Sequence, residues 1–122
     1  MAVDKVLYEL LKGYVSNRAY PGTLPDLASQ TYPCITYGQI AHPMHTIVNT
    51  GSPTFQVDIW GTTYSSVVEL AETIRVGIDR KKDVVLTYPI RVTVLDFLML
   101  PFEDDTKLWH GVMDVQLFYK EV

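Results

Sequence analysis

Two stretches of the chain repeat apolar residues at the spacing of one helical face. In residues 2–14 the apolar positions recur every three or four residues, at Val3, Val6, Leu7, Leu10, Leu11 and Tyr14. In residues 64–80 the same spacing is kept by Val67, Leu70, Ala71, Ile74 and Ile78. Ser66 and Glu69 fit a capping box, although Thr62 or Thr63 could start the helix earlier. The pattern predicts two amphipathic helices, near 2–14 and 64–80, each with one face to bury.

Four further stretches have the character of β-strands. Residues 34–40 are rich in β-branched and aromatic side chains, and residues 54–60 alternate between apolar and polar positions. Residues 90–100 are largely apolar on both faces. Residues 109–119 alternate again, with His110 and Asp114 on the polar side. The apolar side of that last stretch consists of Trp109, Met113, Val115, Leu117 and Tyr119.

The order of these elements predicts the fold class. Residues 16–33 contain three prolines, which exclude a long regular element. A short polar segment, 101–106, joins the last two strands into a long β-hairpin. One-sided helices and alternating strands bury their apolar faces by packing in two layers. We therefore expect an α+β fold, an antiparallel-rich sheet with two helices packed on one face and a long C-terminal β-hairpin, in a single domain spanning 1–122.

Charge and composition narrow the functional classes. Fourteen acidic and ten basic residues give a net charge of −4, whereas binding to DNA through its phosphates favours a basic surplus. One cysteine cannot form an internal disulfide. No run of 18 apolar residues occurs, and the first residues are too highly charged for a signal peptide. We expect a domain that is made in the cytoplasm and has no membrane partner.

Candidate chemistry is sparse. His42 and His45 could share a metal ion with His110 or Cys34, but zinc needs three or four converging ligands. Cys34 falls inside a predicted strand, where a buried and inert thiol is usual. The sequence has no nucleophile motif and no glycine-rich phosphate loop. We expect no catalytic residue, no metal and no cofactor.

Read in order, several short motifs resemble a known family. They are the helix VLYELLKG, the turn 18–20 with Pro21, the segment 32–37, the segment 55–61 with Thr63 and Tyr64, the stretch 71–75, and the ending 111–117. Together they are similar to the tail-completion proteins of long-tailed phages and prophages, which are also called tail terminators or tail-to-head joining proteins. The resemblance covers nearly the whole chain except residues 42–53.

The resemblance implies a virion protein of the phage tail, made in the bacterial host cytoplasm. Such a protein forms a ring, generally of six copies, that caps the finished tail tube and joins it to the head. Its partners would be other copies of itself, the tail tube protein and a head-completion or connector protein, with DNA passing through unbound. Six copies would carry about −24 formal charges, which repel DNA at short range.

On this interpretation the last two strands supply the contacts between subunits. Their apolar content exceeds what one buried face requires, and we expect a subunit interface at Leu95, Phe97, Leu98, Met99, Leu100, Phe102 and Trp109. The adjacent acids Glu103, Asp104 and Asp105 would form a lumen or docking face, or simply a solvated turn. Two other functions stay open, a neck or head-completion connector and a small-ligand-binding α+β domain.

Overall fold

The computed structural model describes residues 3–22, 31–41, 44–45, 50–86 and 88–120. The helices are α1 (Val3–Leu11), the short 3-10 helix η1 (Lys12–Tyr14) and α2 (Tyr64–Ile78). The strands are β1 (Ala19–Pro21), β2 (Cys34–Ala41), β3 (Met44–His45), β4 (Thr50–Gly51), β5 (Thr54–Gly61), β6 (Lys82–Val85), β7 (Tyr88–Met99) and β8 (Trp109–Lys120). The predicted α+β fold and both predicted helices are confirmed.

The described strands form one mixed sheet that is mostly antiparallel. Along the sheet β1, β2, β5 and β8 are neighbours, β8 also pairs with β7, and β7 pairs with β6. The short strands β3 and β4 pair with each other, and β4 continues beside β8. Only the pairing of β1 with β2 is parallel among the described strands. The predicted long hairpin is confirmed, because β7 and β8 pair from Ile90 with Tyr119 to Met99 with Gly111.

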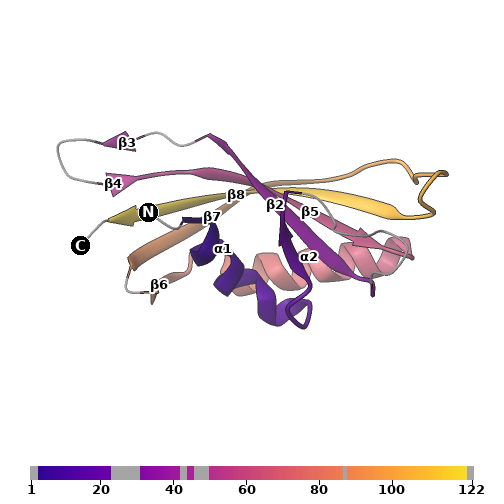
Figure 1. The fold of residues 1–122 in the computed structure, drawn as a ribbon, viewed down its shortest axis with the longest axis horizontal. Coiled ribbons are helices and arrows are strands. Elements are labelled where there is room, and N and C mark those ends of the chain that lie inside the picture. Colours follow the sequence, from indigo (N-terminus) through magenta and orange to yellow (C-terminus); the bar gives the residue numbers. More distant parts are fainter. Residues whose placement is uncertain (1–2, 23–30, 42–43, 46–49, 87, 121–122) are drawn as a thin grey trace.

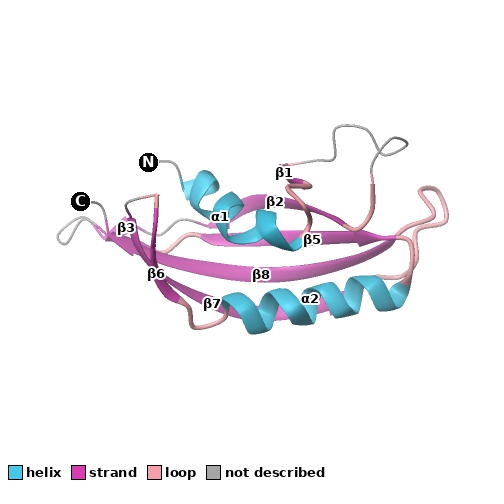
Figure 2. Ribbon diagram, turned by 90° about the horizontal axis from the view of Figure 1, so that it is seen from below, coloured by secondary structure: helices cyan, strands magenta, loops and turns pink. Residues whose placement is uncertain are grey.

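Both helices lie on one face of the sheet, as predicted, and no helix of the described residues covers the other face (Figure 1). Seen from the helical side, α1 lies near β2 and β5, whereas α2 runs along β7 and β8 (Figure 2). The strand residues that face the helices form the core, with Phe55, Val57, Ile59, Met113 and Val115 all fully buried. We call the uncovered side the open face of the sheet.

Close packing of α2 on the hairpin depends on a glycine. A Cβ atom at Gly111 would lie 2.8 Å from the Phe97 ring and 2.9 Å from a methyl carbon of Val67. The absence of a side chain at Gly111 thus lets the helix and the neighbouring strand approach β8 at this point.

The boundaries of α2 differ slightly from the prediction. Thr63, one of the two earlier starts that the sequence allowed, is the N-cap, and its hydroxyl accepts a hydrogen bond from the Ser66 amide. The helix ends at Ile78, and Asp79 is the C-cap. Among the described residues, no helix is both long and apolar enough to cross a membrane.

Candidate functional site

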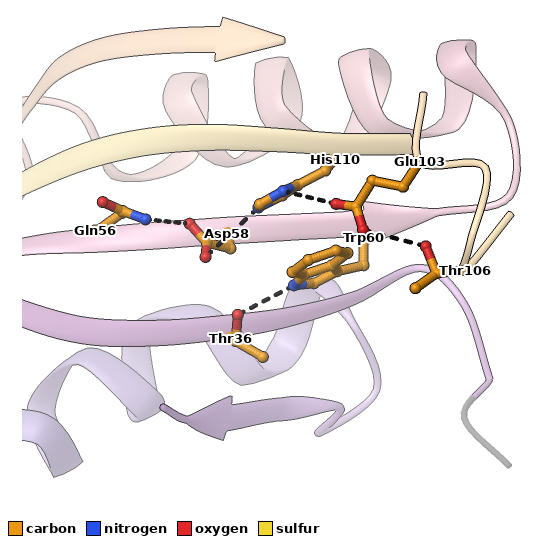
Figure 3. Close-up of polar contacts among 7 residues, drawn as sticks. All are labelled: Thr36, Gln56, Asp58, Trp60, Glu103, Thr106 and His110. Atoms are coloured by element: carbon orange, nitrogen blue, oxygen red, sulfur yellow. Dashed lines mark hydrogen bonds and ion pairs between the residues drawn. The ribbon is translucent and has the colours of Figure 1, made fainter. Parts of the chain in front are cut away.

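A cluster of polar and aromatic side chains lies on the open face where β5 and β8 meet the hairpin loop (Figure 3). Trp60 and His110 stand directly opposite each other in the two strands. Their rings are stacked, with centroids 3.8 Å apart and planes 12° from parallel. The indole Nε1 of Trp60 donates a hydrogen bond of 3.1 Å to Oγ1 of Thr36 on β2. The stack therefore joins three neighbouring strands.

Two carboxylates flank the His110 ring, one on each nitrogen. Nε2 lies 3.5 Å from Oδ2 of Asp58, and Nδ1 lies 3.4 Å from Oε2 of Glu103 in the hairpin loop. Nε2 is buried and makes no hydrogen bond of regular geometry to Asp58. The outer oxygens of both acids are also held, since Gln56 donates to Asp58 and Thr106 donates to Glu103.

The geometry of this cluster favours bracing over catalysis. Its two hydroxyls are engaged elsewhere, because Thr36 accepts from Trp60 and Thr106 donates to Glu103. Neither is directed at His110 as a nucleophile would be. The two carboxylates contact opposite sides of the ring, and in the described part of the chain no three acidic, histidine or cysteine side chains are arranged to hold a metal ion. What the cluster does is tie the hairpin loop to the sheet.

A second cluster braces the hairpin from the helical face. Trp109 at the start of β8 packs against the core and makes an edge contact with Tyr64, with ring centroids 5.2 Å apart. Phe102 from the hairpin loop contacts the same indole ring at 5.1 Å. Consecutive residues of a strand point to opposite faces. Trp109 and His110 thus hold the loop end of the hairpin from both faces of the sheet.

The structure divides the seven residues expected at a subunit interface into two groups. Phe97, Met99 and Trp109 pack against the core from the helical face. Leu95, Leu98 and Phe102 are exposed, with Leu98 the most exposed at 59%, and Leu100 is half-buried. A bulge between Val94 and Asp96 shifts the alternation of β7, which places Leu98 on the open face opposite Val112.

The three acids of the hairpin loop also separate. Glu103 is half-buried and turned toward His110, whereas Asp104 and Asp105 are exposed. The loop folds back through a hydrogen bond from the Lys107 amide to the Glu103 carbonyl and another from the Glu103 amide to the Leu108 carbonyl. Only Asp104 and Asp105 present their charges freely at the tip.

The structure describes only some of the residues considered for metal binding and thiol chemistry. His42 lies outside the described residues, and for His45 the backbone alone is described, as part of β3. Cys34 is fully buried, and this burial raises the pKa of its thiol to about 11. A thiol with so high a pKa is almost entirely protonated at neutral pH and is a poor nucleophile.

Sequence reasoning missed the roles of Thr36, Asp58 and Trp60, and treated His110 only as a distant metal ligand. The alternation of the strands did place Asp58 and His110 on polar faces. The missing information was the pairing of β5 with β8, which sets these residues side by side. A histidine next to a tryptophan at the start of a hairpin strand is the signal that could have drawn attention to the site.

Replacing His110 with alanine is expected to loosen the hairpin loop. The variant loses the ring stack and both carboxylate contacts, which together stabilise the fold by about 1–3 kcal/mol. Hydrogen exchange should become faster at the Glu103 and Lys107 amides. The control is Phe118→Ala, a change of an exposed ring on the same strand and face. Loop amides that exchange at the parent rate in His110→Ala would contradict the bracing role.

The chain was compared with known protein families, curated proteins and solved structures. No protein-family model matches the chain, and no curated protein matches it either. Among solved structures, a chain of the virion of a native gene transfer agent particle is similar, with a TM-score of 0.74 and 9% sequence identity. The likeness covers 98% of this chain and 96% of that one. At so low an identity it is a likeness of fold, and it extends over essentially the whole domain.

Proposed function

We propose that this chain is a structural protein of a virion and that it completes the tail. In this role, six copies form a ring that caps the finished tail tube and provides the face that joins the head. The protein acts without catalysis and without a cofactor. Its partners are other copies of the chain, the tail tube protein and a head-completion or connector protein. DNA passes through the ring without specific binding.

The observation that carries the virion role is the fold likeness over nearly the full length to a chain of a gene transfer agent virion. The tail-completion role rests on the ordered motifs of the sequence. The structure adds a physical element that suits assembly, a long hairpin whose loop end is held on both faces by Trp109 and His110. A braced hairpin presents Leu95 and Leu98 to a neighbouring copy with little loss of conformational entropy on contact.

The ring would also be acidic, and this suits a channel through which DNA moves. Each copy has a net charge of −4, and Asp104 and Asp105 are exposed at the hairpin tip. Charges of the same sign as the phosphates disfavour binding at distances within the screening length of about 8 Å. DNA would therefore slide past the ring instead of adhering to it.

Disruption of the gene, followed by electron microscopy of the particles, tests this role. A tail-completion protein leaves filled heads unjoined to tails, because the docking face of the tail is missing. A connector on the head side instead leaves tails of normal length and heads that fail to hold their DNA. Normal joined particles would contradict both assignments, and supply of the parent gene in trans is the control for each.

A further inference from the structure

One edge of the sheet is formed by β6 and by the part of β7 that β6 does not reach. Residues just before β6 extend the pairing, since the Val92 amide donates to the Lys81 carbonyl and the Arg80 amide donates to the Val92 carbonyl. In the part of the chain that the structure describes, no strand lies beyond that point on the side of β7 that faces away from β8. An edge of this kind exposes amides to which another strand can add.

Three outward amides of this edge are nonetheless bonded to carboxylates. On β6 the Val84 amide donates to Oδ1 of Asp83 at 2.7 Å. On β7 the Val94 amide donates to Oδ1 of Asp79 at 3.0 Å. Asp79 is the C-cap of α2, so its contact also fastens the end of the helix to the strand.

A third amide on the same edge is bonded in the same way. The Phe97 amide donates to Oδ1 of Asp96 at 2.8 Å. Its direction follows from the ladder, because the Leu100 amide donates inward to the His110 carbonyl and successive amides of a strand point to opposite sides. Phe97 therefore directs its amide away from β8, as Val94 does on the other side of the bulge.

Without these carboxylates, the exposed apolar side chains of this edge would favour the addition of a partner strand. Val84 is 63% exposed and Leu95 is 52% exposed. An incoming strand would have to displace each carboxylate from its amide, and its own carbonyl oxygens would then face a negative charge. The bulge at Leu95 and Asp96 opposes regular pairing further.

We propose that Asp79, Asp83 and Asp96 seal this edge against strand addition. Two copies of the chain therefore do not join their sheets through β6 and β7. Contacts between copies on this side are made by side chains and not by backbone hydrogen bonds. The inference concerns the isolated chain and holds whether or not the protein completes a tail.

The test compares two triple variants that make the same change of charge. Asp79→Ala, Asp83→Ala and Asp96→Ala together remove the three acceptors, whereas the corresponding changes to asparagine keep an acceptor oxygen at each position. In sedimentation velocity over a range of concentrations, we expect the alanine variant to associate at concentrations at least tenfold lower than the parent does. The asparagine variant should behave as the parent does.

Hydrogen exchange provides a second readout at low concentration. The amides of Val84, Val94 and Phe97 should exchange faster in the alanine variant before it associates, and slower once it does. If the alanine variant folds and sediments as the parent does, the proposed seal is wrong. If the alanine and asparagine variants associate equally, the proposal is also wrong, because the effect would then come from the loss of charge alone. If the triple alanine variant does not fold, the single variant Asp96→Ala provides the test. It should speed hydrogen exchange at the Phe97 amide and leave exchange at the Val84 amide unchanged, and any other result would overturn the proposal.

Discussion

Leu98→Asp is expected to abolish the joining of heads to tails while leaving the fold intact. Leu98 is 59% exposed on the open face, so the substitution should lower the free energy of unfolding by no more than about 1 kcal/mol. At the proposed contact between subunits the new carboxylate would be buried without a partner, which costs several kcal/mol at each repeat of the proposed ring. Joined particles, counted in the disruption strain supplied with the variant gene, should fall to the level of the uncomplemented strain.

The matched control for Leu98→Asp is Val76→Asp. Val76 is 68% exposed on α2, and the substitution introduces the same charge on a surface away from the hairpin. This control should restore joining to the level of the parent gene. Full restoration by Leu98→Asp itself, with the variant protein at parent abundance, would remove Leu98 from the proposed subunit contact.

Trp109→Asp is expected to act through folding and not through contact between subunits. The indole packs against the core and against the rings of Tyr64 and Phe102. Loss of this packing and introduction of a carboxylate beside the core should lower the free energy of unfolding by about 2–4 kcal/mol. Urea denaturation followed by circular dichroism measures the change.

The control for this variant keeps an aromatic ring at the position. Trp109→Phe should recover at least half of the lost stability, because the contacts with Tyr64 and Phe102 are partly retained. An unfolding midpoint for Trp109→Asp equal to that of the parent would show that the indole does not stabilise the fold. Any loss of particle joining in Trp109→Asp must be interpreted together with this measurement.

The sequence predicted the layers of the fold well because the buried face of a helix or strand requires apolar residues at a regular spacing. Alternation in 54–60 placed Phe55, Val57 and Ile59 on the buried face, and the helical spacing in 64–80 placed Val67 and Ile74 there. Each of these residues reports its own environment. No knowledge of which strands pair is needed to read such a signal.

The short strands were missed because their pairing, not their composition, makes them strands. β6 begins with Lys82 and Asp83, both exposed, and takes its conformation from hydrogen bonds to β7. β1 is three residues long within a proline-containing loop and pairs in parallel with β2. Local propensity carries little information about such elements.

The site and the two roles of the apolar hairpin required the three-dimensional register. Asp58 and His110 are 52 positions apart in the chain and meet only because β5 and β8 are neighbours. The bulge next to Leu95 explains why β7 is apolar on both sides, since the residues that pack inward are Ile90 and Val92 before it but Phe97 and Met99 after it. An alternation pattern cannot locate a bulge whose position depends on the partner strand.

The length distribution of tails from the disruption strain tests the tail-completion role most directly. A ring that caps the finished tube ends its growth, so without this chain we expect a broad distribution of tails, many of them longer than those of the parent and none joined to a head. Supply of the parent gene should restore one narrow length and joined particles. Tails of parent length, joined to filled heads in the absence of the chain, would contradict the account.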